Sequence, residues 1–203
     1  VTGASSGIGR STAITLSELG ARIIAVGRDS DRLAATMENL KGTENHSVEW
    51  DLTDTDLIPK RILSIAEEHG SLDGIVHAAG IQLIKPVQLY QHSDLEKTMS
   101  INVGAALALA RAYKQRAVLK NGGALVFISS VVASAGQPGT TLYAASKGAL
   151  SAATRSLALE FSRDNVRVNS IAPAMVTTEM TNAMTATLPP DALQAIRNQH
   201  PLG

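Results

Sequence analysis

VTGASSGIG, residues 1–9, is the stretch of sequence from which the fold can be predicted. Its first residue has the character of a strand end, and Gly3, Gly7 and Gly9 permit a tight turn. Apolar residues at helical spacing follow from Ile8 onward. A strand, a glycine-rich turn and a helix N-terminus together present free backbone N–H groups to an anion. The glycine spacing differs from Gly-x-Gly-x-x-Gly, so an ordinary flexible turn is the alternative interpretation.

Short apolar runs alternate with segments of helical periodicity after this stretch. Strands are predicted at residues 21–26, 47–50, 74–78, 124–128 and 166–171. Helices are predicted at residues 8–19, 30–40, 54–69, 94–119 and 143–163. Because strands and helices alternate with short connections, we expect a parallel sheet with helices on both faces. The fold class is therefore α/β, a three-layer, doubly wound Rossmann fold.

Local signals indicate where two of these helices begin. Thr53 or Asp54 is expected to cap the third helix, with Pro59 in its first turn. Ser93 and Glu96 have the Ser-x-x-Glu spacing of a capping box, which predicts the start of the fourth helix.

Composition restricts the class of protein. The 203 residues are 44% hydrophobic, and 18 basic side chains balance 18 acidic ones. This balance argues against nucleic acid or an anionic membrane surface as the main partner. The absence of cysteine excludes a thiol nucleophile and a thiolate metal site, and no His, Asp or Glu cluster suggests a metal. No signal peptide or membrane-spanning run is evident, so a cytoplasmic location is expected.

Ligands in doubly wound sheets bind beyond the carboxyl ends of the strands. Residues with suitable chemistry fall at those ends, and we expect them to form one site: Gly3, Arg28, Asp51, Gly80, Ser130 and Pro173. In a dinucleotide-binding fold, an acid just after the strand at 21–26 would bind the 2′-hydroxyl of NAD, whereas an arginine there accommodates the 2′-phosphate of NADP. The chain has Gly27 and Arg28 before its first acid, Asp29, which favours NADP(H). An arginine at a strand end is also common on protein surfaces.

Tyr143 and Lys147 are four residues apart on a predicted helix, so their side chains share one face. A phenol beside an ammonium group is suited to proton transfer, because the positive charge is expected to lower the pKa of the phenol. Taken alone, such a pair is more often a solvated surface pair. Its place after a strand that ends in Ser129 and Ser130 favours the catalytic interpretation.

Seven short motifs then occur in a fixed order: TGASSGIG at 2–9, DL at 51–52, AAG at 78–80, SINV at 100–103, ISS at 128–130, Tyr143-x-x-x-Lys147, and NSIAP at 169–173. On these motifs the chain resembles the classical short-chain dehydrogenases/reductases over essentially its full length. Within this family, the chain is most similar in general to the 3-oxoacyl-carrier-protein reductases and related sugar or steroid dehydrogenases. The resemblance implies a single dinucleotide-binding oxidoreductase domain over residues 1–203 that lacks the start of its first strand and its C-terminal end.

The resemblance also implies which residues act. Catalysis falls to Asn102, Ser130, Tyr143 and Lys147, with Ser130 preferred to Ser129. The cofactor is expected to contact Gly3, Ser5, Ser6, Gly7, Ile8, Gly9, Arg28, Asp51, Leu52, Ala79, Gly80, Asn102, Tyr143, Lys147, Pro173, Val176 and Thr178.

Some of these positions carry finer expectations. By the resemblance, Asp51 and Leu52 contact the adenine, and Thr178 contacts the nicotinamide carboxamide. Two residues depart from the family pattern. His77 stands where the family usually has Asn, and we expect it to be structural. Ala174 stands where the family usually has Gly, so the turn beside the nicotinamide is expected to differ slightly.

The implied reaction is hydride transfer between NADP(H), with NAD(H) as the second choice, and a small carbonyl/secondary alcohol pair. Tyr143 would transfer the proton, and Ser130 would stabilise charge on the substrate oxygen. Lys147 would hold the nicotinamide ribose, and Asn102 would fix a water that relays protons. A non-catalytic sensor of nicotinamide dinucleotides is the alternative. A lyase or epimerase on the same fold is a third hypothesis, but its usual extra acid/base residues are not recognisable.

Two expectations concern surfaces. Residues 175–203, with a helix at 191–198, are expected to form a methionine-lined lid over the substrate or else a peripheral helix. Apolar stripes on two helices predict a homo-oligomer, a tetramer or a dimer, although both stripes can instead cover the sheet. The stripes are Ala105, Ala106, Leu109 and Ala112 on one helix, and Ala149, Leu150, Ala153, Leu157 and Phe161 on the other.

Overall fold

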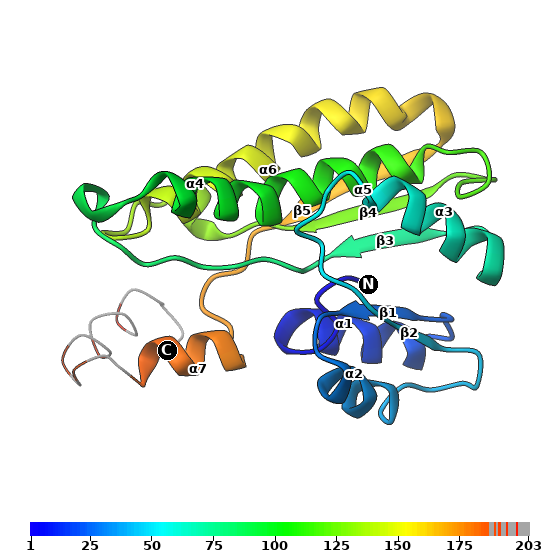
Figure 1. Ribbon diagram of the computed structural model, residues 1–203, viewed down its shortest axis with the longest axis horizontal. Coiled ribbons are helices and arrows are strands. Elements are labelled where there is room, and N and C mark those ends of the chain that lie inside the picture. Colours follow the sequence, from blue (N-terminus) through cyan, green and yellow to red (C-terminus); the bar gives the residue numbers. More distant parts are fainter. Residues whose placement is uncertain (187–188, 190, 192–193, 195–197, 199–203) are drawn as a thin grey trace.

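Parallel strands form the centre of the computed structural model, which describes residues 1–186, 189, 191, 194 and 198 (Figure 1). The strands are β1 (Ile24–Gly27), β2 (His46–Glu49), β3 (Gly74–His77), β4 (Gly123–Ile128) and β5 (Val166–Ile171). β1 pairs with β2, and β4 pairs with both β3 and β5, always in parallel. Thr2 bridges Val26 of β1 and His77 of β3, so the spatial order is β2-β1-Thr2-β3-β4-β5.

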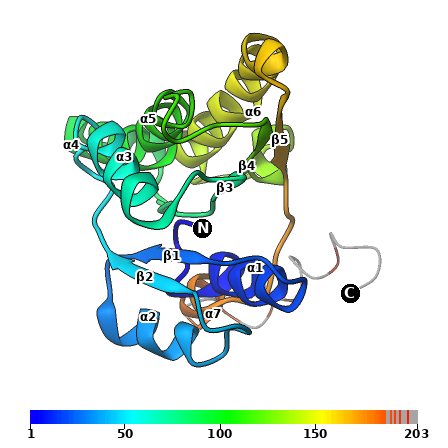
Figure 2. The same ribbon diagram turned by 90° about the vertical axis from the view of Figure 1, so that its right-hand side faces the viewer.

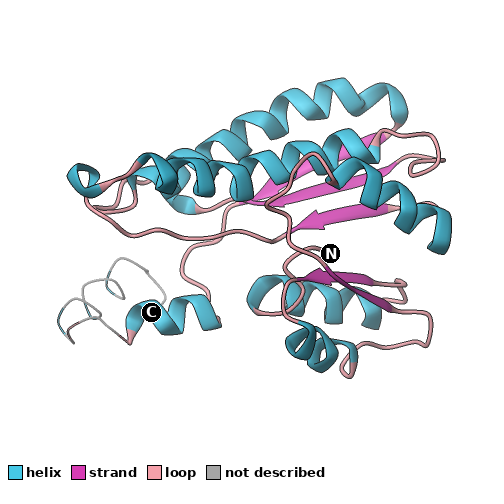
Figure 3. Cartoon of the chain, in the orientation of Figure 1, coloured by secondary structure: helices cyan, strands magenta, loops and turns pink. Residues whose placement is uncertain are grey.

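Helices cover both faces of this sheet (Figures 1 and 2). On one side lie α3 (Ile58–His69), α4 (His92–Met99), α5 (Ala105–Tyr113) and α6 (Thr141–Phe161); on the other lie α1 (Gly7–Glu18) and α2 (Ser30–Met37). α7 (Glu179–Thr185) follows β5. A π-helix (Ser100–Gly104) joins α4 to α5, and 3₁₀ turns occupy Val87–Leu89, Val131–Ala133 and Ser162–Asp164. Figure 3 shows how regularly helix and strand alternate along the chain.

Each face of the sheet has its own apolar core. The larger core lies under α3 and α5, where Ile58, Leu109 and Leu125 are completely buried. The smaller core lies under α1 and α2 and includes Ala13 and Leu33. Burial of each large aliphatic side chain contributes about 1.5–3 kcal/mol, so these cores fix the strand ends in space. The predicted α/β doubly wound fold is confirmed, and each predicted strand is found within three residues of its expected bounds.

The helix predicted at 94–119 is wrong in two respects. The π-helix interrupts it and places Asn102 in a wide turn, a feature that often occurs at functional sites. The helix also ends at Tyr113. The chain turns there because Val118 packs in the core and its carbonyl accepts a hydrogen bond from Leu72 N at 2.9 Å.

The predicted start of α3 is also wrong. Neither Thr53 nor Asp54 caps it, and Leu57 is the N-cap residue, although Pro59 does lie in the first turn as predicted. Thr53 N instead donates to Asp51 Oδ1 at 2.9 Å, which closes a local turn that keeps the chain non-helical.

The capping box of α4 is shifted from the predicted one. Ser93 and Glu96 do not form it; Gln91 is the N-cap residue, and its backbone N–H donates to Asp94 Oδ2 at 3.0 Å. Asp94 is also 2.6 Å from Lys85 Nζ, and this hydrogen bond leads the causes that lower the pKa of Asp94. The Asp94 carboxylate therefore contacts both Gln91 N and Lys85 Nζ, and its position determines where α4 begins.

The α5 stripe that suggested an oligomer covers the sheet instead. Its residues are fully buried within this one chain: Ala105, Ala106, Leu109 and Ala112. On α6, Leu150 and Phe161 are likewise buried, while Ala149, Ala153 and Leu157 are half-buried. The predicted oligomer therefore has no support from the α5 stripe.

The C-terminal prediction is tested only in part. α7 begins the segment expected to be a lid, but most of the helix predicted at 191–198 lies outside the described residues. Among the helices that are described, none combines the length and the apolar character needed to span a membrane.

Candidate active site

Two adjoining cavities lie at the carboxyl ends of the strands. The first, of about 210 Å³, lies over the glycine-rich turn, and the second, of about 230 Å³, lies over Tyr143. They share Gly80, Ile81, Thr178 and Met180 along their common border. An elongated ligand can therefore occupy both, with one end at each cavity.

The first cavity has a floor that only glycine can form. A Cβ at Gly9 would lie 2.2 Å from the carbonyl oxygen of Gly3, and a Cβ at Gly3 would lie 2.7 Å from Ala79 N. Gly3 also has a φ of +68°, which side chains rarely tolerate. The turn, α1 and the loop after β3 thus meet backbone to backbone. This approach brings the first turn of α1 to the cavity, where N–H groups of a helix N-terminus can serve an anionic ligand.

Most residues assigned to the cofactor line this first cavity: Gly3, Ser5, Ser6, Gly7, Ile8, Gly9, Arg28, Asp51, Leu52, Ala79, Gly80 and Thr178. Pro173 and Val176 line the second cavity with Ser130, Tyr143 and Lys147. Sequence reasoning missed Trp50, Ile81, Ile101 and Glu179, which also line the first cavity, and it expected Met180 only in the methionine-lined lid. The only sequence signal for Trp50 and Glu179 was that each is adjacent to a residue predicted to contact the cofactor, Asp51 and Thr178 respectively.

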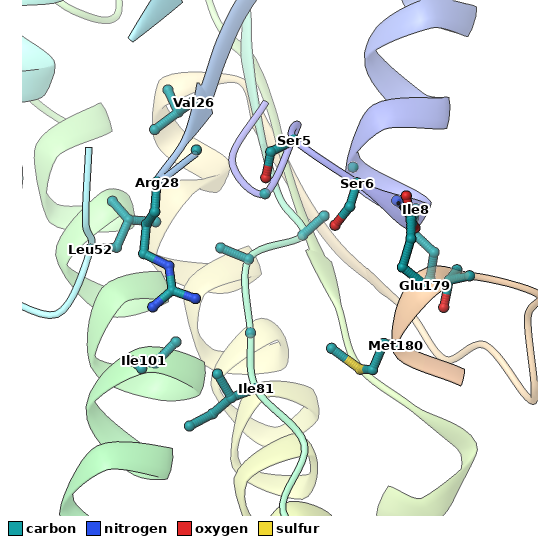
Figure 4. Close-up of a pocket in the computed structure, with 18 of the residues that line it drawn as sticks. Ser5, Ser6, Ile8, Val26, Arg28, Leu52, Ile81, Ile101, Glu179 and Met180 are labelled. Carbon is teal, nitrogen blue, oxygen red and sulfur yellow. Dashed lines mark hydrogen bonds between the residues drawn. The ribbon is translucent and has the colours of Figure 1, made fainter. Parts of the chain in front are cut away.

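Arg28 and Glu179 lie on opposite sides of the first cavity (Figure 4). Arg28 Nη1 is 3.8 Å from Asp51 Oδ2, and both side chains are more than half exposed. Salt bridges between exposed side chains contribute only about 0–1 kcal/mol. The guanidinium group is therefore available to an anionic ligand at small cost.

Lys147 is held deep in the second cavity. The residue is only 5% exposed, and its Nζ donates to the carbonyl oxygen of Ile128 at 2.7 Å. Burial disfavours the ammonium form and lowers the pKa of Lys147 to about 8. Its Nζ lies 5.7 Å from the centre of the Tyr143 ring. The predicted proximity of the two side chains is therefore observed.

The expected effect of Lys147 on Tyr143 is not observed. Burial of the phenol raises the pKa of Tyr143, and a hydrogen bond with Ser130 offsets this only in part. The reason is that the ring is mostly removed from water, while the ammonium group is directed at the Ile128 carbonyl. In this structure Tyr143 is therefore a protonated phenol at neutral pH, suited to donating a proton.

The two neighbouring serines have different surroundings. Ser130 faces Tyr143, as the hydrogen bond between their side chains requires. Ser129 is buried, and its hydroxyl donates to the Lys147 carbonyl at 2.9 Å and lies 2.8 Å from Ser151 Oγ. Ser129 therefore ties β4 to α6, which agrees with the preference for Ser130 as the reactive serine.

Asn102 is completely buried, and its side-chain amide is used as a brace. Its Oδ1 accepts from Ile81 N at 2.9 Å, while its Nδ2 donates to Ile81 O at 3.0 Å and to Ser146 Oγ at 2.9 Å. Ser146 in turn donates to the Tyr143 carbonyl at 2.7 Å. The π-helix, the loop after β3 and the start of α6 are thereby linked around the cavity.

His77 has a structural environment, as expected from the sequence. It is 1% exposed, and its Nδ1 is 2.9 Å from the hydroxyl of Thr2, which also accepts from Ala79 N at 3.3 Å. Burial, followed by the nearby charge of Lys147, lowers the pKa of His77 to about 3. The ring is neutral at physiological pH and connects the central strands. Among the described residues, no group of three or more His, Asp or Glu side chains is placed to hold a metal.

The short chain dehydrogenase family model matches residues 1–189. Gluconate 5-dehydrogenase of Gluconobacter oxydans is 31% identical over 188 residues, 92% of this chain and 73% of that enzyme. A 3-oxoacyl-[acyl-carrier-protein] reductase of Thermotoga maritima is 31% identical over 206 residues, 100% of this chain and 82% of that enzyme.

Solved structures agree with these sequence matches. A short-chain dehydrogenase of Shigella flexneri, complexed with NADP, is 32% identical, with a TM-score of 0.83 over 95% of this chain and 82% of that one. A 4-hydroxyisoleucine dehydrogenase complexed with NADH and succinate is 30% identical, with a TM-score of 0.80 over 92% and 79%. The predicted resemblance is confirmed, and the chain belongs to the short-chain dehydrogenase family of oxidoreductases.

Proposed function

We propose that the chain is an NADP(H)-dependent oxidoreductase that interconverts a carbonyl compound and a secondary alcohol. The observation that carries this proposal is the convergence of Ser130, Tyr143 and Lys147 on a cavity that adjoins the glycine-rich turn. A proton donor, a hydrogen-bond donor and a cation at the end of a dinucleotide-sized groove match carbonyl reduction. Membership in the family supports the reaction class.

The residues of the first cavity fit a nicotinamide dinucleotide. Gly3 and Gly9 permit the close backbone packing that brings the first turn of α1 to the cavity, and the N–H groups of a helix N-terminus attract anions. Arg28 and Asp51 border the adenosine end, and Thr178 borders the nicotinamide end. When bound there, the cofactor supplies or accepts the hydride. The protein supplies position and electrostatics.

The side chains of the second cavity would transfer the proton. In reduction, the protonated phenol of Tyr143 donates to the substrate oxygen, while Ser130 donates a hydrogen bond to the same oxygen. Lys147, with a pKa of about 8, can return a proton toward Tyr143 near neutral pH and is placed to hold the nicotinamide ribose. The brace formed by Asn102 and Ser146 keeps the loop after β3 and α6 in register. A water relay at Asn102 stays a prediction.

Arg28 supports the choice of NADP(H) over NAD(H). It lines the first cavity at the end of β1, where position 27 is glycine and not an acid. Asp51 is the one acid that Arg28 contacts among the described residues, and a phosphate can displace that exposed partner. Relatives have been solved with NADP and with NADH, so the preference requires measurement.

Turnover distinguishes this function from a non-catalytic dinucleotide sensor. Purified protein is incubated with NADPH and a panel of ketones, 3-oxoacyl thioesters, sugar-derived ketones and steroid ketones, and loss of NADPH absorbance is followed. Oxidation of NADPH with at least one carbonyl class is expected. Tight NADPH binding without turnover of any class would favour the sensor.

The organisation of the protein is also proposed. We infer a single domain, because one sheet with its two cores unites all the elements described. We also infer a cytoplasmic homo-oligomer, a tetramer or a dimer. Leu107 on α5 and Leu159 on α6 are large exposed apolar side chains that a neighbouring subunit would cover. Light scattering at micromolar concentration tests this, and a monomer mass would refute it.

A further inference from the structure

The first turn of α1 already contacts a carboxylate of the chain itself. Gly7 N donates to Glu179 Oε2 at 3.0 Å, and Glu179 Oε1 lies 3.3 Å from Arg10 Nη1. Hydrogen bonds from the backbone of Glu179 and of Gly7, together with the charge of Arg10, hold the pKa of this carboxyl below its ordinary value. Glu179 therefore carries its negative charge at neutral pH.

This carboxylate engages a backbone donor that an anion bound at the first turn of α1 would use. The N–H groups at the start of α1 attract one anion, and Gly7 is part of the glycine-rich turn that lines the first cavity. The packing at Gly7 is close as well, because a Cβ there would lie 3.1 Å from Thr178 Cγ2. One N–H group cannot serve two anions at once, so a diphosphate that accepts from Gly7 N excludes the Glu179 carboxylate from it.

We propose that Glu179 is an internal competitor for the diphosphate of the cofactor, and that cofactor binding displaces it from the first turn of α1. This proposal rests on the proposed function. Displacement leaves a cation behind, because Arg10 is also anchored by Ser5 O and by Thr36 Oγ1, the latter at 3.2 Å from its Nε. Arg10 Nη1 then loses its carboxylate partner, and its positive charge near the first turn of α1 favours an anion there.

The displacement also connects the two ends of the site. Glu179 is the first residue of α7, and Thr178 is its N-cap, with a hydroxyl that accepts from Thr181 N at 3.3 Å. Thr178 borders both cavities. Movement of Glu179 therefore shifts the residue expected at the nicotinamide. The affinity of the cofactor is lowered by the cost of releasing this contact, and α7 responds to whether the diphosphate is bound.

The test is Glu179→Gln in the full chain, which keeps size and an acceptor oxygen but removes the charge. Glu18→Gln is the matched control, since Glu18 is exposed at the C-terminal end of α1, opposite the turn that Glu179 contacts. Dissociation constants are measured for NADPH and for inorganic pyrophosphate, with the quenching of the single tryptophan, Trp50 in the first cavity, as the signal. Glu179→Gln should bind both ligands about 5–30-fold more tightly, because the side chain that competes with them loses its ion pair with Arg10 and its charge at the helix N-terminus.

The control should bind both ligands within about twofold of the native protein. Unchanged or weaker pyrophosphate binding by Glu179→Gln would overturn the proposal, and Glu179→Ala must agree in direction with Glu179→Gln. If no form of the protein binds either nicotinamide cofactor, the proposed function fails. The pyrophosphate measurement still decides whether Glu179 competes for the anion site.

Discussion

Replacing Arg28 by Ala tests cofactor choice at a single contact. Arg28 Nη1 lies 3.8 Å from Asp51 Oδ2 and its side chain is 60% exposed, so leaving this partner costs less than about 1 kcal/mol. A hydrogen bond between a guanidinium group and a phosphate contributes about 1.5–3 kcal/mol, which exposure to solvent reduces to about 1–2 kcal/mol. The expected loss of NADPH affinity is therefore about 5–30-fold.

The same substitution should leave NADH affinity within about twofold, because NADH has no 2′-phosphate to contact. Dissociation constants and kcat/KM are measured for both cofactors in native protein, Arg28→Ala and Arg116→Ala. Arg116 is exposed and lines neither cavity, so it controls for the loss of one positive charge. A native preference for NADH that Arg28→Ala does not alter would refute the assignment.

Three further predictions follow from packing and burial. Gly9→Ala should lower stability by about 1–3 kcal/mol and weaken NADPH binding at least tenfold, because its Cβ meets a carbonyl oxygen at 2.2 Å. The control Gly148→Ala on α6 should instead raise stability by about 0.5–1 kcal/mol. Chemical denaturation and cofactor titration compare the two variants. Lys147→Met should abolish turnover yet remove a penalty of up to about 3 kcal/mol, since the pKa of this lysine falls from 10.5 to about 8 on folding. The unfolded chain binds more protons between these values, so native stability should rise from pH 8 to 10.5, and a flat profile in native protein would contradict the burial. Ser130→Ala should lower kcat by about 10²-fold at unchanged stability, whereas Ser129→Ala should mainly lower stability, by about 1–2 kcal/mol; equal effects on kcat would undo the distinction.

The sequence was sufficient for the elements whose signal is local. The strand at 124–128 is a short apolar run, and the glycine-rich turn carries its own conformational requirement, so both were found where predicted. Helix ends were less predictable. The start of α3 depends on a turn closed by Asp51, and the end of α5 depends on a distant contact between Val118 and Leu72. Neither of these hydrogen bonds produces a periodic pattern in the sequence from which it could be predicted.

The candidate site, like the fold, could be predicted from the sequence only in part. The residues expected to surround the two cavities do so, with Asn102 directly behind Gly80 rather than on the cavity surface. Proton affinities were not predictable, because the pKa of Tyr143 depends on how deeply its ring is buried. Glu179 was missed because its partner Gly7 is 172 residues away in sequence. The π-helix at Asn102 was missed because its extra residue per turn is imposed by packing.

Turnover by Tyr143→Phe tests the central claim most directly. Phenylalanine keeps the ring in its half-buried place and removes only the hydroxyl that hydrogen-bonds with Ser130. Because a positioned general acid contributes about 10²–10⁴-fold, kcat for carbonyl reduction with NADPH should fall by at least about 100-fold. NADPH affinity and the unfolding midpoint should stay close to native values. Reduction within about tenfold of the native rate would contradict the assignment of Tyr143 as the proton donor.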